Sequence, residues 1–183
     1  MTTGEFRKRQ LVTSIYLPSL LITAAEGALL PILPVSAVGF GFSLAEASIV
    51  TTVLMVSTMV FEVPASWINA KIGERNAMLV STVLGFAMTL LAFFQLGYPA
   101  LILSALGFGA AHSIFGLARH SLLAEIVPEQ HRPKSMSLLG GMFRGGMAIG
   151  PVVGSAFIVL YGVEFGYLAA ALLSLAAGAS VLT

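Results

Sequence analysis

The chain has 183 residues, of which 57% are apolar and only 9% are charged, and its mean hydropathy is +0.97. A soluble domain carries roughly 25% charged residues, and a chain of this size cannot bury so much apolar surface in water. Nine Lys and Arg against eight Glu leave a net charge of +1, which cannot attract a polyanion. The composition excludes a free-standing soluble domain, a disordered region and a nucleic-acid binder, and it indicates an integral membrane protein.

Charged residues and turns divide the chain into six apolar runs, at about residues 11–38, 47–70, 77–95, 100–127, 135–160 and 165–183. Each run supplies the roughly 17–25 residues that a helix needs to cross a hydrocarbon core of ~30 Å. Because an open strand edge cannot survive in lipid, we predict an all-α membrane protein with six transmembrane helices. The first run is longer than the roughly 7–15 apolar residues of a signal peptide, so we interpret it as the first span.

The basic residues predict the orientation of these spans. Cytoplasmic loops of membrane proteins carry an excess of Lys and Arg. A cytoplasmic N-terminus places seven of the nine basic residues inside, namely Arg7, Lys8, Arg9, Lys71, Arg75, Arg132 and Lys134. The short loops and the lack of a polar tail are compatible with a bacterial inner membrane. The chain stops at Thr183, near the end of the sixth run, as expected for one half of a longer protein.

Three charged residues lie at similar predicted depths in different spans. Counting helical residues from the cytoplasmic side places Glu62, Arg119 and Arg144 about 12–14 Å into the membrane. Charges at this depth are costly and tend to pair, so we predict an ion-paired cluster that ties spans two, four and five together. A purely structural role for this cluster is the favoured interpretation.

Two further ionisable residues lie deeper. Glu26 is ~22 Å from the start of the first run, and His112 reaches a similar depth in span four. A carboxylate near the bilayer midplane with an imidazole opposite could bind and release a proton, which suits proton coupling or a substrate cavity. A hydrogen-bonded Glu that closes a helix contact is the alternative. His112 by itself is more typical of a packed histidine.

Span five carries regularly spaced glycines. Gly146, Gly150 and Gly154 recur every fourth residue, which places them on one face where another helix can approach closely. Pro151 removes one helix hydrogen bond and is predicted to bend the backbone. Generic helix packing would satisfy the same pattern.

Motifs of catalysis are absent from the sequence. It contains no G-x-S-x-G or H-E-x-x-H motif, no cysteine and no aspartate, so a serine hydrolase, a zinc protease and an intramembrane aspartyl protease are not indicated. The three histidines lack zinc-ligand spacing. We therefore expect no enzyme activity, no metal and no cofactor. No filter-like loop indicates a channel.

The span-five sequence GMAIGPVVGS resembles the antiporter-associated motif G-x-x-x-G-P-x-x-G-G of the major facilitator superfamily. The matching residues are Gly146, Gly150, Pro151 and Gly154. Ser155 replaces the last glycine of the motif, and Ser137 replaces an earlier one. The passage LARHSLLAEIVPEQHRPKSMSLLGGMFRGG is similar to bacterial drug-efflux members, in which an arginine at the position of Arg144 often precedes the Gly-Pro pair.

The family also has a signature in a cytoplasmic loop, P-x-G-x-L-A-D-R-x-G-R-R, and FEVPASWINAKIGERNAML lies in its place. Residues that match it, identically or by charge, are Pro64, Lys71, Gly73 and Arg75. Ala70 replaces its aspartate, which in the family latches the two halves, so Glu74 or Glu62 would have to take that role. Ser66 replaces its glycine, and Leu103 replaces the span-four arginine linked with proton antiport.

The resemblance covers essentially the whole chain and carries expectations of fold and function. It implies two inverted three-helix repeats, which form half of a twelve-helix transporter, with a second six-helix bundle as partner. Glu26 and His112 would face a central cavity and Arg144 would lie near it. The implied function is a secondary transporter of small molecules, of efflux type and possibly proton-coupled. A non-transporting scaffold or a half-size protein that dimerises through the glycine face of span five is the alternative.

Overall fold

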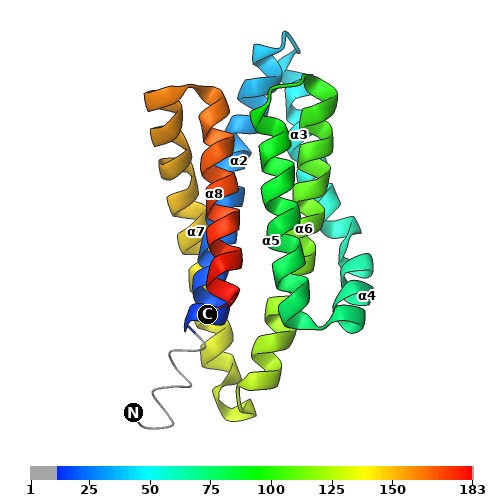
Figure 1. Cartoon of the computed structure of the whole chain (residues 1–183), viewed down its shortest axis with the longest axis vertical. Coiled ribbons are helices and arrows are strands. Elements are labelled where there is room, and N and C mark those ends of the chain that lie inside the picture. The colour runs from blue at the N-terminus through cyan, green and yellow to red at the C-terminus, as the bar shows by residue number, and fades with distance from the viewer. Residues whose placement is uncertain (1–11, 183) are drawn as a thin grey trace.

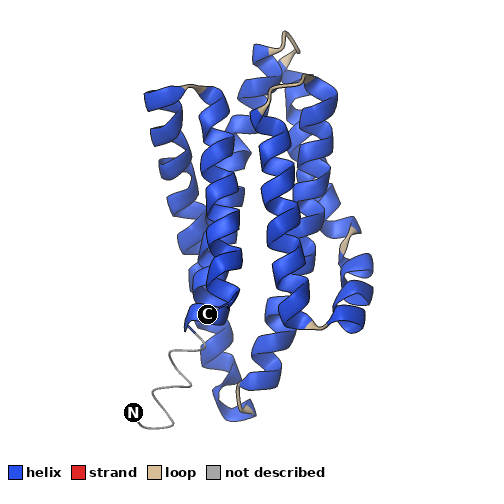
Figure 2. Cartoon of the chain, viewed as in Figure 1, coloured by secondary structure: helices blue, strands red, loops and turns tan. Residues whose placement is uncertain are grey.

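A computed structural model describes residues 12–182, and the regular structure in this range is helical (Figures 1 and 2). The prediction of an all-α membrane protein is confirmed. Five helices in this range are long and apolar enough to cross a membrane, and two shorter helices that meet at a 50° bend form a sixth candidate span. The basic tail (Arg7, Lys8, Arg9) and Leu11 and Thr183, at the ends of the first and last predicted spans, lie outside the described residues.

Successive spans alternate in direction and are joined by short connections, with α3 and α4 counted as one bent span (Figure 1). In chain order they are a π-helical turn η1 (Val12–Tyr16), α2 (Leu17–Gly39), α3 (Leu44–Val60), α4 (Glu62–Ile72), α5 (Glu74–Phe93), α6 (Tyr98–Ile126), a 3-10 turn η2 (Glu129–His131), α7 (Arg132–Tyr161) and α8 (Val163–Leu182).

The run predicted as one span over 47–70 is broken into α3 and α4 at Phe61. Pro64 explains the break, because its nitrogen has no hydrogen to donate to the carbonyl of Val60 and its ring clashes with that carbonyl. A proline in the first turn of a new helix is tolerated, so the chain resumes as α4 from Glu62. In contrast, α2 continues through Pro31 and Pro34.

The helices pack in two groups that meet at the centre (Figure 1). In one group α2 contacts α7 and α8, and in the other α6 contacts α3 and α5. Contacts between α5 and α8 and between α2 and α3 join the groups. The most buried spans are α2 and α6, and α7 is the most exposed of the unbroken spans. Polar groups on α2 and α6 are therefore the best shielded from lipid.

Small and polar residues hold the seams between helices. The hydroxyl of Ser57 on α3 donates to the carbonyl of Leu106 on α6 at 2.6 Å. The hydroxyl of Tyr167 on α8 donates to Ser36 Oγ on α2 at 2.8 Å. Such bonds contribute modestly to helix association in a membrane, and short side chains let the backbones approach.

Candidate functional site

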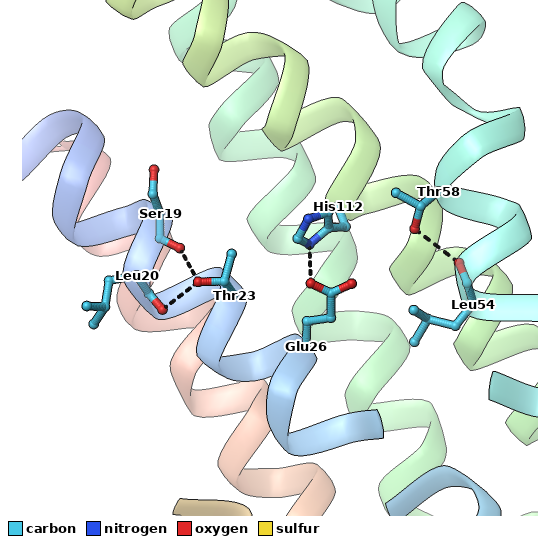
Figure 3. A network of polar contacts seen from close by, with 7 residues as sticks. All are labelled: Ser19, Leu20, Thr23, Glu26, Leu54, Thr58 and His112. Carbon is cyan, nitrogen blue, oxygen red and sulfur yellow. Dashed lines mark hydrogen bonds and ion pairs between the residues drawn. The ribbon is translucent and has the colours of Figure 1, made fainter. Parts of the chain in front are cut away.

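Glu26 lies midway along α2, one turn after a polar segment of the same helix. The hydroxyl of Thr23 donates to the carbonyls of Ser19 at 2.8 Å and Leu20 at 3.1 Å, so its hydrogen is used within the helix (Figure 3). The side chain of Glu26 is 13% exposed and points toward α6 (Figure 3). The carboxylate is therefore left for a partner on another helix.

That partner is His112 of α6. Its Nδ1 lies 3.4 Å from Glu26 Oε2, and the imidazole side chain is 10% exposed (Figure 3). The two atoms face each other as an ion pair would, yet the contact lacks hydrogen-bond geometry, and both atoms are buried without a hydrogen-bond partner. The structure therefore brings together the two residues that the sequence places at similar depth, in a contact that one added proton would strengthen.

Arg119 is the third member of this buried cluster. Its residue exposure is 5%, and its guanidinium carbon lies 6.0 Å from the ring centroid of Phe115. Arg119 follows His112 by seven positions, or about two helical turns, so both lie on one face of α6. Helical side chains point toward the helix N-terminus, which directs Arg119 toward His112. The charge of Glu26 acts on both residues.

The predicted ion-paired cluster of Glu62, Arg119 and Arg144 is wrong. Glu62 and Arg144 are exposed, and the ion pairs among residues 12–182 are Glu26–His112 and Glu129–Arg132. Depth alone does not specify which face of a helix carries a residue. The bend at Phe61 also directs α4 away from α3, so Glu62 is turned out of the bundle.

The glycines of α7 position the α2 segment that carries Glu26. A Cβ at Gly146 would come within 2.9 Å of the nitrogen of Ala24 and would overlap the hydroxyl of Thr23. A Cβ at Gly150 would lie 2.7 Å from the nitrogen of Ala28. The backbone of α7 therefore packs directly on the backbone of α2, both before and after Glu26 in the sequence of α2.

The residues of the cytoplasmic signature have separate structural roles. Pro64 ends α3, and Gly73 joins α4 to α5 with φ +81° and ψ 158°, a conformation that only glycine adopts freely. Arg75 Nη2 donates to the carbonyls of Val181 at 3.1 Å and Leu182 at 3.0 Å, which joins the start of α5 to the last described turn of α8. Lys71 is exposed on α4.

An open cavity of about 710 Å³ lies between α2 and α3. It begins at Leu30, one helical turn beyond Glu26, and its lining is predominantly apolar. Its polar lining residues are Ser48, Thr51 and Thr52 of α3. The cavity was not anticipated from the sequence. Within residues 12–182, no three His, Cys, Asp or Glu residues converge in a way that could hold a metal ion.

These features define an integral membrane protein whose helical bundle encloses a charged cluster, an arrangement used by membrane transporters. The sequence model of the Major Facilitator Superfamily matches residues 15–183. The chain therefore belongs to the major facilitator superfamily, whose members are generally transporters rather than enzymes. Residues Glu26, His112 and Arg119 all lie within the matched range.

A curated relative supports the same class. Over 113 residues, or 61% of this chain, the sequence is 30% identical to "Probable anion transporter 7" of Oryza sativa subsp. japonica. The matched segment makes up 26% of that relative, so the chain spans well under half of its length.

Proposed function

We propose that this chain is the N-terminal bundle of a secondary active transporter of small molecules, of efflux type, in a bacterial inner membrane with a cytoplasmic N-terminus. A second six-helix bundle of the same protein completes it, and transport proceeds by alternating access. In this proposal Glu26 and His112 form the proton-coupling site. The observation that carries it is the contact of 3.4 Å between these side chains on the two most buried spans.

The chemistry of the contact supports a proton site. Chains of Glu, Asp and His inside membranes commonly relay protons in pumps and transporters. Neither facing atom has a hydrogen-bond partner, so a proton placed between them would form a charge-assisted hydrogen bond that the unprotonated pair lacks. A site that gains such a bond on one side of the membrane and loses it on the other couples proton movement to the change of access.

The packing pattern supports two inverted three-helix repeats. Two such repeats would make α2 equivalent to α6, α3 to α7 and α5 to α8. Under this equivalence the α2–α7 contact corresponds to the α6–α3 contact, and the α2–α8 contact corresponds to the α6–α5 contact. All four contacts are present. Two spans, the broken α3–α4 pair and α5, lie between α2 and α6, so α2 and α6 run in opposite directions (Figure 1). Glu26 and His112 each follow two alanines, which fits equivalent positions near the symmetry axis.

Residues of the antiporter-type motif fit a role in gating. Gly146, Gly150 and Gly154 are buried against α2, and Pro151 lies between them. We assign this seam to closure of the outer side. In the proposed transporter α2, α3, α6 and α7 face the central cavity, with Arg144 near it, and α5 and α8 lie outside.

Dimerisation of a half-size protein is disfavoured by the same seam. That alternative requires the glycine face of α7 to be available to a second copy. A Cβ on Gly150 would overlap the carbonyl of Ala24, so this face is already occupied by α2.

Flux in proteoliposomes tests the proposed function. The protein in its natural full length is reconstituted, and an imposed pH gradient drives radiolabelled tetraphenylphosphonium, hippurate or hippuramide. We expect the pH gradient to accelerate the flux of at least one probe. Glu26→Gln should abolish that acceleration, while exchange of the probe in the absence of a gradient continues. Glu129→Gln, which removes a carboxylate that is 89% exposed, is the matched control and should stay coupled. Absence of gradient-driven flux for all three probes, or full coupling in Glu26→Gln, would contradict the proposal.

A further inference from the structure

The open cavity of about 710 Å³ lies at the end of the bundle where α2 turns into α3 (Figure 1). Its lining comes from these two helices alone and includes neither Glu26 nor His112. The volume falls in the range of about 300–1,000 Å³ that is typical of sites for drug-sized molecules. The cavity is therefore a candidate binding site that is separate from the proposed proton site.

The α2 wall of this cavity contains a backbone acceptor that has lost its helical donor. The carbonyl of Leu30 would normally accept from the nitrogen four residues later, which belongs to Pro34 and carries no hydrogen. Leu30 and Pro34 both line the cavity, so the missing bond lies in its wall. Pro31 deprives the carbonyl of Gly27 in the same way, but neither of these two residues lines the cavity.

The α3 wall contributes three hydroxyl groups. Ser48 donates its hydrogen to the carbonyl of Ala45 at 2.7 Å, and Thr52 donates to the carbonyl of Ser48 at 2.9 Å, so both oxygens remain only as acceptors. The hydroxyl of the half-buried Thr51 makes no hydrogen bond to any residue in the described range 12–182. All four polar groups of the cavity can therefore accept a hydrogen bond, whereas only Thr51 can also donate one.

We propose that this cavity binds a neutral amphipathic molecule that carries an O–H or N–H donor on a hydrocarbon body. None of the lining residues is charged, so a charged ligand would lose its hydration without gaining a counter-charge. The excess of acceptors selects a ligand that donates, because a polar group of the ligand without a partner is costly to bury. Apolar side chains such as Val35 and Met55, which are 55% and 54% exposed, are available to cover the hydrocarbon body. Binding here requires neither proton coupling nor transport, so it is independent of the proposed function.

Photolabelling with two matched probes tests the site. The natural full-length protein in lipid nanodiscs is irradiated with 4-(hydroxymethyl)benzophenone, a neutral alcohol, or with 4-(methoxymethyl)benzophenone, which has no donor. The two probes are compared at equal mole fractions in the lipid, and the adduct on the α3 peptide that contains Met55 is measured against probe concentration. We expect saturable labelling with both probes and roughly three- to tenfold tighter binding of the alcohol, as one net hydrogen bond predicts.

Two substitutions remove acceptors while keeping the cavity. Thr51→Val replaces the hydroxyl with a methyl group, and Pro34→Ala restores a donor to the carbonyl of Leu30. The double variant should bind the two probes equally. Thr58→Val, which removes a hydroxyl that bonds within α3 (Figure 3), and Pro31→Ala are the matched controls outside the cavity. Both controls should keep the preference for the alcohol.

The outcomes separate this ligand from other occupants of the cavity. Equal binding of the two probes by the wild type, or a preference for the alcohol that survives in the double variant, would overturn the inference. Labelling at Met55 that is absent or never saturates would mean that lipid chains or the second bundle fill the cavity, and it would also overturn the inference. If the double variant cannot be purified, each single variant should reduce the preference, and an unreduced preference in both would count against the site.

Discussion

Arg119 and Arg144 lie on either side of the turn that joins α6 to α7, about 10 Å before the end of α6 and about 18 Å after the start of α7. Their surroundings are opposite. Arg119 is 5% exposed and lies within the bundle, on the same face of α6 as His112. Arg144 is exposed on α7 and makes no ion pair among the described residues.

The difference follows from the face of the helix on which each arginine lies. On α7, Gly146 faces α2, and a residue two positions earlier lies about 200° around the helix, so Arg144 points away from the bundle. On α6, Arg119 shares the face of His112, which points at α2. A charge at a given depth is therefore structural, functional or lipid-facing according to the neighbour that its face meets.

The largest expected effect separates the two arginines. Arg119→Met removes a buried guanidinium whose Nε and Nη1 have no hydrogen-bond partner, and we expect it to raise the free energy of unfolding by about 2 kcal/mol. Arg144→Gln removes an exposed group and should change it by less than about 0.5 kcal/mol. Titration with denaturing detergent, followed by circular dichroism, measures both. Equal changes in the two variants would mean that burial does not distinguish these arginines.

An intermediate effect is expected where α7 meets α2, the contact that turns Arg144 outward. Gly150→Ala places a methyl group on the backbone of Ala24 and should lower the free energy of unfolding by roughly 2 kcal/mol. Gly140→Ala on the same helix meets nothing within 4 Å and should raise it by about 0.5–1 kcal/mol. The same detergent titration compares the pair, and a Gly150→Ala protein as stable as Gly140→Ala would contradict the close seam.

The smallest effect concerns an arginine at the end of the bundle that has partners. Arg75→Gln loses two hydrogen bonds to the end of α8 and should cost about 1 kcal/mol. Lys71→Gln, an exposed neighbour, should cost less than about 0.5 kcal/mol. Hydrogen exchange at the last turn of α8 should quicken in Arg75→Gln alone. If exchange there is unaltered, Arg75 does not stabilise that turn.

Much of the fold follows from composition and local sequence. Long uncharged runs require helices in lipid, because every backbone polar group must be paired within its own segment. The same reasoning does not extend to breaks within an apolar run. It did not predict the break at Phe61, although Pro64 carries the signal, since α2 tolerates Pro31 and Pro34 inside one helix.

By itself the sequence determined the helical membrane class and the position of each charge along its apolar run, because apolar length and a rise of about 1.5 Å per residue suffice for both. Only the tertiary structure decided which charges meet. Helices can rotate about their axes without changing depth, and packing selects one rotation, here through glycines that allow α7 to lie directly on α2. That selection brought Glu26 to His112, buried Arg119 on the same face of α6 and left Glu62 and Arg144 exposed.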